Sequence, residues 1–223
     1  MERREGSVRG VLIELAQRML AAGLTSGTSG NLSARLGNRV LITPSGVAYG
    51  DLTEDAIVAL DLEGQTVRHG PKPSVDAPIH CAVYRARPEL GGFVHTHSPH
   101  AVAFAIVGEA IPPLQIEAAG YLGGAVRVMD YLPPADATVA DRVPEALGSD
   151  RAILLPNHGV YAVGETIDAA FTAAQIVEDS APSSSSVRGW SVNSRTWRVR
   201  SSGRTRSSAV AGSDMEAPPQ RWP

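Results

Sequence analysis

The chain has 223 residues, of which 43% are apolar, so it can bury a core for one or two domains. Its single cysteine, Cys81, excludes an internal disulfide framework and is typical of the reducing cytoplasm, where we expect the protein to work. A net charge of only −3 gives no reason to expect nucleic acid or a membrane as a partner. The charged start and the short apolar runs predict neither a signal peptide nor a membrane span.

The composition divides the chain into two unlike parts. Residues 181–223 hold seven arginines against two acidic residues, together with eleven serines and all three tryptophans. This segment carries +5, which leaves −8 for residues 1–180 of a chain whose total is −3. We therefore expect a folded body over 1–180 and a disordered or atypical tail over 181–223. An RNA-binding arm and a shifted reading frame after "QIVEDSA" are the alternative interpretations of the tail.

The first half of the body predicts a helix followed by strands. An amphipathic helix, stopped by Gly23, is expected from apolar residues at helical spacing, namely Val8, Val11, Leu12, Leu15 and Met19. The stretch "RVLITPSG" predicts a short strand that breaks at Pro44, and "DAIVALDLEGQTVRHG" predicts a strand, a turn and a return strand.

The second half alternates irregularly between helices and strands. Helices are expected from Asp76, from Ser98-Pro99 and from Ile167, and strands in "GGFVHTH", "AVRVMDYL" and "RAILLPNHGVYAVG". Strand–turn–strand pairs occur among them, so a doubly wound parallel sheet is disfavoured. We predict a three-layer α/β/α sandwich with a mixed, largely antiparallel central sheet.

Three histidines follow apolar strands and can form a metal site. His95 and His97 are two residues apart, so in a strand they project from the same face. His158 follows another apolar strand and lies in a turn with Gly159. Three such imidazoles can fill three corners of a zinc tetrahedron and leave the fourth open to substrate. The alternative is that they are polar residues on a solvated sheet face. His80 and His100 lie near the starts of predicted helices, where they can support the ligands or serve for ordinary capping and packing, which we favour.

Small-residue loops and one carboxylate complete the candidate site. The loops "GTSGN" and "TPSG" can wrap a phosphate with backbone N–H groups and hydroxyls, although such loops are more often plain turns. Ser74 adds a hydroxyl close to Asp76 in "KPSVD". Asp76 itself either complements the helix dipole or acts as an acid/base beside the metal.

Five ordered motifs carry a resemblance to a known family. They are "GLTSGTSGNLSAR", "LITPSG", "KPSVDAPIH", "GGFVHTHSPHA" and "LLPNHGVYAVG". In this order they resemble the class II aldolase/adducin family, whose enzymes include L-fuculose-1-phosphate aldolase and L-ribulose-5-phosphate 4-epimerase. The resemblance covers roughly residues 8 to 180. It implies a three-layer α/β/α fold and a homotetramer with active sites near subunit interfaces.

The resemblance also assigns roles to individual residues. It implies that His95, His97 and His158 bind one Zn²⁺ per subunit, and that Asp76 is the acidic residue beside it. The residues implied to hold the phosphate of a small phosphorylated sugar are Gly30, Asn31, Thr43, Ser45, Gly46 and Ser74.

The implied reaction is the reversible cleavage of a sugar 1-phosphate of the fuculose-1-phosphate type into dihydroxyacetone phosphate and an aldehyde. The metal would act as a Lewis acid and stabilise the enediolate left when the C3–C4 bond breaks. Asp76 would move the proton at the enediolate carbon, and the phosphate loops would supply binding energy remote from the reacting bond.

Departures from the family pattern keep other activities open. Aldolases of the family usually have glutamate in a "P-S-S-E" context, whereas this chain has "P-S-V-D", as in the epimerase branch. The aldolase tyrosine after "I-P-P" is out of register, so Glu117 or Tyr121, from this or a neighbouring subunit, is the candidate acid for the leaving group. The tail provides no tyrosine.

The alternatives are a pentulose-5-phosphate 4-epimerase and a decarboxylase or dehydratase of a phosphorylated sugar acid or ketose. An adducin-like module without enzymatic activity is disfavoured, because such a module has no need of three zinc ligands.

Overall fold

The computed structural model describes residues 5–67, 69–133 and 138–186, with the backbone alone for Glu117 and residues 182–186. All of them belong to one compact unit, Met1–Trp190. The tail expected over 181–223 therefore lies outside the described residues from position 187 onward, and its predicted character stays a prediction. None of the described helices has the length and apolar character that a membrane span requires.

The centre of the fold is a six-stranded sheet in the order β3-β2-β1-β4-β6-β5. All five neighbouring pairs are antiparallel. The sheet thus fulfils the expected largely antiparallel arrangement, and a single isolated bridge, Val128↔Leu154, is its parallel element among the described residues. The strands are β1 (Asn31–Leu36), β2 (Arg39–Ile42), β3 (Val58–Asp61), β4 (Gly92–Thr96), β5 (Ala152–Leu155) and β6 (Gly159–Gly164).

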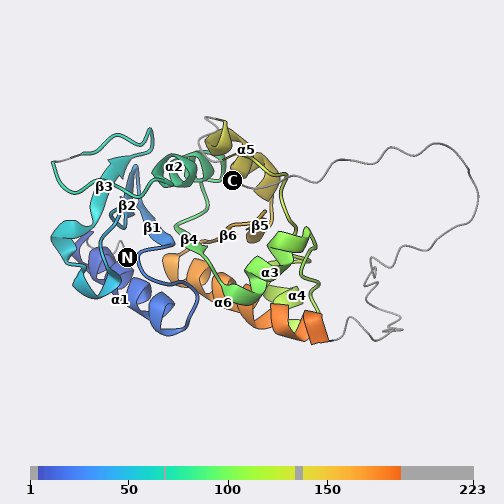
Figure 1. The fold of residues 1–223 in the computed structure, drawn as a ribbon. Helices are drawn as coiled ribbons and strands as arrows, with labels where there is room; N and C mark the ends of the chain where they lie inside the picture. Colours follow the sequence, from blue (N-terminus) through green and yellow to red (C-terminus); the bar gives the residue numbers. More distant parts are fainter. Residues whose placement is uncertain (1–4, 68, 134–137, 187–223) are drawn as a thin grey trace, which may run out of the picture. The chain divides into compact units, whose positions relative to one another are not determined.

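Helices cover both faces of this sheet (Figure 1). One face packs against α1 (Glu5–Ala21), α3 (Pro99–Val107), α4 (Ile116–Leu122) and α6 (Ile167–Ser186). The other packs against α2 (Ala77–Ala86) and α5 (Val139–Leu147). Two short 3₁₀ turns, η1 (Tyr49–Asp51) and η2 (Glu54–Ala56), precede β3. The predicted three-layer α/β/α sandwich is therefore confirmed.

Strand alternation divides the apolar residues between two cores. In β4, Val94 packs into the core beneath α1 and α6, whereas Phe93 packs into the core beneath α2 and α5. Each large apolar side chain buried in this way contributes about 1.5–3 kcal/mol relative to exposure. Because side chains two residues apart share a face, His95 lies on the α2 side with Phe93. The alternation that builds the core thus also determines the face of the sheet on which the candidate ligand His95 lies.

Some predicted elements differ from the structure. The segment "AVRVMDYL" forms isolated bridges at Val126 and Val128 in place of a strand, and the return strand after β3 is reduced to the bridge Leu60↔Thr66. Strand β1 was not predicted, because its small polar residues obscure the apolar alternation. The last helix begins at Ile167 as expected and continues to Ser186, past the predicted boundary at residue 180.

Candidate metal centre

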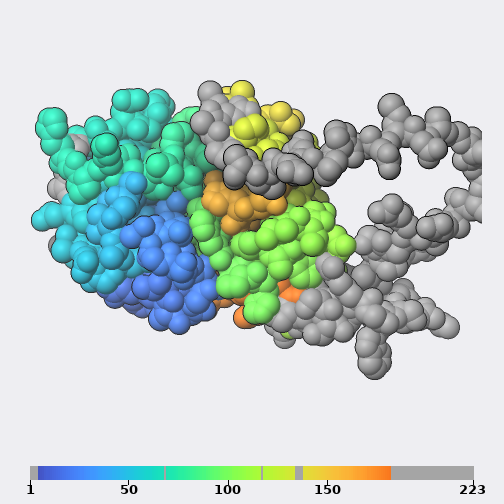
Figure 2. Space-filling view, viewed as in Figure 1, coloured from blue at the N-terminus to red at the C-terminus, as the bar shows by residue number. Residues whose placement is uncertain are grey.

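Two neighbouring strands present the three histidines. His95 lies in β4 and His97 directly follows it, while His158 lies in the tight turn between β5 and β6. That turn depends on Asn157, which has a φ of 58°, in the left-handed region that asparagine tolerates better than most residues. His158 is exposed, and atoms of this orange part of the chain reach the surface beside the green atoms of α3 (Figure 2).

Two glycines allow β4 to lie close to its neighbours at His95. A Cβ on Gly30 would come within 2.6 Å of the His95 carbonyl oxygen. A Cβ on Gly159 would lie 2.3 Å from the Thr96 oxygen and 2.9 Å from the His95 ring. Since real Cβ atoms do not approach so closely, both positions require glycine if the histidines are to keep this arrangement.

The three rings converge through their Nε2 atoms. His95 Nε2 lies 3.1 Å from His97 Nε2 and 3.3 Å from His158 Nε2. Each of the three residues offers a ring nitrogen, and these atoms all lie within 4.8 Å of one another. His95 Nδ1 is 3.0 Å from the Val160 carbonyl and donates to it, so the lone pair of His95 Nε2 faces the other two rings. This donor set fits a divalent metal ion with three imidazole ligands.

The protonation state of the histidines also suits a metal. Burial lowers the pKa of His95 to about 4, and burial together with His158 lowers the pKa of His97. Both rings are therefore neutral at pH 7. Metal ligation needs neutral imidazole, so no proton has to be removed before binding.

Asp76 lies beside the histidines as an ionised carboxylate. Its Oδ2 is 3.7 Å from His95 Nε2 and accepts a hydrogen bond of 2.8 Å from Asn31 Nδ2. Burial alone would raise the pKa of Asp76, but the nearby His95 and the hydrogen bond from Asn31 outweigh it and lower the pKa. The carboxylate is thus held in its charged form next to the metal ligands, where it can accept a proton.

The residues expected to hold a phosphate come together before α2. Ser74 N donates to the Thr43 carbonyl at 3.2 Å and Ser45 N to the Lys72 carbonyl at 2.9 Å, so two segments lie side by side. Ser45 and Gly46 are exposed at this point, whereas Thr43 is buried and its hydroxyl accepts a hydrogen bond from the Leu32 amide. Ser74 Oγ accepts from Asp76 N at 3.3 Å.

Asn31 has a different contact from the expected one. Its amide group binds Asp76, and its Oδ1 is buried without a hydrogen-bond partner among the described residues. A buried unpaired acceptor is uncommon and is therefore available to a ligand. Asn31 pairs with His95 across β1 and β4, so it lies beside the candidate metal centre as well as at the end of the loop that Gly30 closes.

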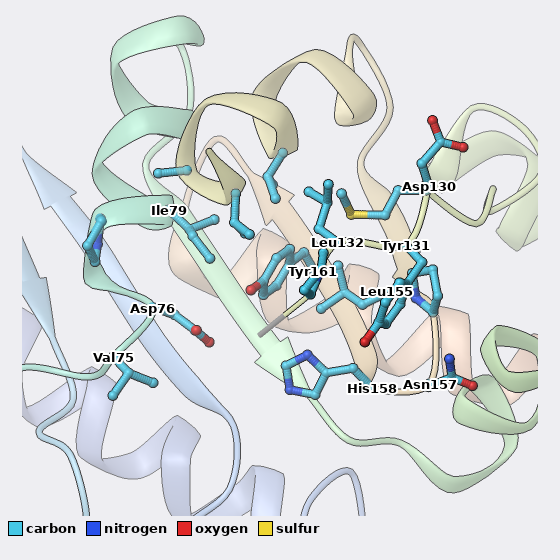
Figure 3. A pocket seen from close by; sticks show the side chains of 17 residues that line it. Val75, Asp76, Ile79, Asp130, Tyr131, Leu132, Leu155, Asn157, His158 and Tyr161 are labelled. Atoms are coloured by element: carbon cyan, nitrogen blue, oxygen red, sulfur yellow. The ribbon is translucent and has the colours of Figure 1, made fainter. Parts of the chain in front are cut away.

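A cavity of about 770 Å³ opens from the candidate metal centre. Asp76 and His158 lie on one side of it, with Tyr161 beside them (Figure 3). Three further polar side chains, Asp130, Tyr131 and Asn157, also line it. The rest of the described wall is apolar and comes from α2, α5, β5, residues 129–133 and the positions next to α2 and β5: Val75, Pro78, Ile79, Met129, Leu132, Pro133, Val139, Ala140, Val143, Leu155 and Pro156.

Glu117 and Tyr121, the expected acids for the leaving group, are both in α4, and Tyr121 does not line this cavity. The Tyr121 hydroxyl donates to the Ala169 carbonyl at 3.1 Å, and Arg151 lies over its ring. Within one chain, Tyr121 thus contacts α6, away from the histidines. That Tyr121 reaches the active site of a neighbouring subunit stays a prediction.

A buried polar chain beneath the site was not predicted. His80 Nδ1 and Ser33 Oγ are 2.7 Å apart, and Ser33 Oγ is 2.9 Å from the Tyr84 hydroxyl. His80 stacks on Phe93 at 3.7 Å, and burial lowers its pKa to about 3. The sequence shows that His80 and Tyr84 are one helical turn apart. It does not show that both contact Ser33, which is distant along the chain.

The other predicted packing histidine, His100, contacts α6. Its Nδ1 lies 2.7 Å from Glu178 Oε1, and the same carboxylate accepts from the backbone amides of His100 and Ala101 at the start of α3. His100 therefore does not join the three histidines, in agreement with the expectation that it caps or packs.

Comparisons with known proteins agree with this geometry. The chain is 37% identical over 174 residues to a 5-methylthioribulose-1-phosphate/5-deoxyribulose-1-phosphate aldolase of Rhodospirillum rubrum, covering 78% of each chain. It is 34% identical over 174 residues to a 3-oxo-tetronate 4-phosphate decarboxylase of Haemophilus influenzae, covering 75% of this chain and 82% of the relative. A solved structure of an L-fuculose 1-phosphate aldolase superposes with a TM-score of 0.77 at 29% identity, covering 82% of this chain and 87% of that one. Residues 11–183 match the family described as "Class II Aldolase and Adducin N-terminal domain", and the chain belongs to this family.

Proposed function

We propose that the chain is a zinc-dependent aldolase that reversibly cleaves a ketose 1-phosphate into dihydroxyacetone phosphate and an aldehyde. The observation that carries the proposal is the juxtaposition of three converging imidazoles, an ionised Asp76 carboxylate 3.7 Å from His95 and a cavity with mainly apolar walls. This arrangement combines a place for a Lewis acid, a proton acceptor and room for the aldehyde half of the substrate.

His95, His97 and His158 would hold the metal, and three nitrogen ligands with an open position suit catalytic zinc. When bound, the metal supplies Lewis-acid stabilisation of the negative charge that develops on substrate oxygens during bond cleavage.

The other residues bind the substrate and move protons. Asp76 takes the proton from the carbon next to the carbonyl of dihydroxyacetone phosphate, and Asn31 holds its carboxylate in place through the 2.8 Å hydrogen bond. The exposed Ser45–Gly46 loop and Ser74 bind the phosphate. Binding of the phosphate at a distance from the reacting carbon then positions that carbon against Asp76.

The cavity favours an aldehyde that ends in an apolar group. Ile79, Leu132 and Val143 are among its walls, and none of the described lining residues is a lysine or arginine that could pair with a substrate carboxylate. Acetaldehyde, lactaldehyde and a methylthio-substituted aldehyde fit this description. They correspond to 5-deoxy, fuculose-type and methylthio ketose phosphates, and the Rhodospirillum relative is named for two of these substrates.

Decarboxylation of a phosphorylated oxo-acid is the second candidate, supported by the 34% identity to the Haemophilus decarboxylase. Loss of CO₂ would leave the same kind of enediolate, whose carbon then takes up a proton instead of losing one. Decarboxylation is less favoured than the aldolase reaction, because the described cavity residues include no cationic side chain that could bind the substrate carboxylate.

The proposal is tested by supplying the zinc-loaded protein with dihydroxyacetone phosphate and four aldehydes: acetaldehyde, (methylthio)acetaldehyde, glycolaldehyde and glyceraldehyde. We expect to detect condensation products by mass spectrometry. The kcat/KM for acetaldehyde and (methylthio)acetaldehyde should be at least about tenfold higher than for glycolaldehyde and glyceraldehyde. Parallel reactions contain L-ribulose 5-phosphate or 3-oxo-tetronate 4-phosphate. Epimerisation or decarboxylation of these compounds without any condensation would contradict the aldolase proposal.

A further inference from the structure

Tyr161 differs from the other buried tyrosines in the use of its hydroxyl. The Tyr49 hydroxyl donates to the Ser29 and Gly30 carbonyls at 2.9 and 2.7 Å, and the Tyr84 hydroxyl to the Ser33 carbonyl at 3.0 Å. Tyr161 is only 2% exposed, yet its hydroxyl has no hydrogen-bond partner within the described part of the chain. The hydroxyl oxygen borders the cavity and is not among the enclosed polar atoms that lack a partner, so a ligand in the cavity can reach it.

The position of Tyr161 is fixed by the sheet. It is paired with His95 across β4 and β6, and its ring lies 4.8 Å from the His95 ring and 5.1 Å from the Phe93 ring. These contacts leave the phenol little freedom to rotate away. Its hydroxyl projects into the cavity on the side where Asp76 lies (Figure 3).

Other hydroxyl and carboxyl groups near the cavity are less suited to a substrate atom next to the metal. Tyr121 donates to Ala169 and does not line the cavity. Tyr131 is 58% exposed, and the Asp130 side chain is 93% exposed. Among the described lining residues, Tyr161 therefore provides the hydroxyl that is enclosed and directed toward Asp76 and the histidines.

We propose that the Tyr161 hydroxyl donates a hydrogen bond to the oxygen on the substrate carbon that leaves as the aldehyde, and so acts as a catalytic residue of the aldolase. This inference rests on the proposed function. In condensation, Asp76 removes one proton from dihydroxyacetone phosphate, and the resulting electron pair forms the new C–C bond. The π-electron pair of the aldehyde moves onto its oxygen, which takes one proton from water while Asp76 returns one to water. Tyr161 stabilises this oxygen while it carries negative charge.

Two half-reactions separate this role from that of Asp76. Exchange of the carbon-bound proton of dihydroxyacetone phosphate with D₂O needs the base and the metal but no aldehyde, and NMR follows it. Condensation needs the aldehyde oxygen as well. For Tyr161→Phe, which keeps the ring and its packing, we expect proton exchange near the wild-type rate and a loss of about 100-fold in kcat/KM for condensation. Zinc content and the circular dichroism spectrum should not change.

Tyr84→Phe is the matched variant, since it removes a buried hydroxyl that donates to the Ser33 carbonyl and Tyr84 does not line the cavity; both of its reactions should stay near wild type. The inference is overturned if Tyr161→Phe condenses at the wild-type rate, if it loses exchange and condensation equally, or if Tyr84→Phe loses condensation to the same extent. A wild-type protein that performs neither reaction would instead overturn the proposed function, and the inference with it.

Discussion

Asp76 and Asn31 act as a pair at the residue scale. Asn31 donates one amide hydrogen to Asp76, and its own oxygen has no partner among the described residues, while Asp76 lies 3.7 Å from His95. A carboxylate that accepts a hydrogen bond beside the ligands of a metal ion stays ionised and oriented. The pair is formed by residues 45 positions apart, so its formation requires β1 and the start of α2 to be correctly packed.

Asp76→Asn tests the base. The substitution keeps the size of the side chain but removes the proton acceptor, so we expect the exchange of dihydroxyacetone phosphate with D₂O to fall by about 100-fold or more. Asp130→Asn is the control, because that carboxylate is also at the cavity but 93% exposed. Exchange at the wild-type rate in Asp76→Asn would show that another group removes the proton.

His158 and His100 provide a second test at this scale. We expect His158→Ala to lose bound zinc, measured by mass spectrometry of the dialysed protein, because it removes one of three ligands. His100→Ala should retain one zinc ion per chain, since the His100 ring contacts Glu178 and not the other histidines. Equal zinc contents in the two variants would contradict the assignment of His158.

The element that organises the site is β4, which is packed between β1 and β6. Gly30 in the approach to β1 and Gly159 at the start of β6 both face the backbone near His95. Neither position leaves room for a methyl group, so the separation of the strands at the candidate metal centre depends on these two residues. The close approach of three backbones brings His95, His97 and His158 within range of a single ion.

Gly159→Ala should therefore destabilise the folded protein. A Cβ 2.3 Å from the Thr96 oxygen must displace β4 or β6, and we expect the free energy of unfolding to fall by about 2 kcal/mol or more. Gly120→Ala is the matched change: Gly120 lies in α4 with nothing within 4 Å of the added atom, so helix propensity should raise stability by up to about 1 kcal/mol. Urea denaturation measures both. A neutral Gly159→Ala would show that the strands can separate without strain.

At the scale of the whole molecule, buried neutral histidines make stability depend on pH. In the metal-free protein, burial lowers the pKa of His80 to about 3 and of His95 to about 4, whereas both titrate near about 6.5 in the unfolded chain. Below pH 6.5 the unfolded chain binds protons that the folded protein does not. The stability that the two neutral histidines provide is thus complete above pH 6.5, and it is lost as the pH falls toward their pKa values in the folded protein.

We expect the unfolding free energy of the metal-free protein to be lower at pH 5 than at pH 7, by up to about 4 kcal/mol for the two histidines together. Urea denaturation in the presence of a chelator measures it. In His80→Asn, which removes one of the two groups, the loss on acidification should be about half as large. Stability that is constant or higher at pH 5 would contradict the burial of neutral histidine.

Much of the fold was predictable because its signals are local. Helices α1, α2, α3 and α6 have apolar residues at helical spacing or a proline in the first turn. Strands β5 and β6 are continuous apolar runs, and β4 begins with apolar residues. Strand β1 was missed because its pairing with both β2 and β4, and not its composition, makes it a central strand. The segment at Val126 and Val128 has strand composition but finds only isolated partners.

The sequence by itself determined the family, the layered fold and the identity of the three candidate ligands, because these depend on residue types at fixed spacings along short segments. The tertiary structure alone decided which groups meet: the Asn31 amide on Asp76, the Tyr121 hydroxyl on Ala169, and the Tyr161 hydroxyl at a mainly apolar cavity, without a partner among the described residues. These contacts join segments that are 45 or more residues apart or depend on the walls around them. Spacing along the chain carries no information about such contacts, since they arise from strand register and helix packing.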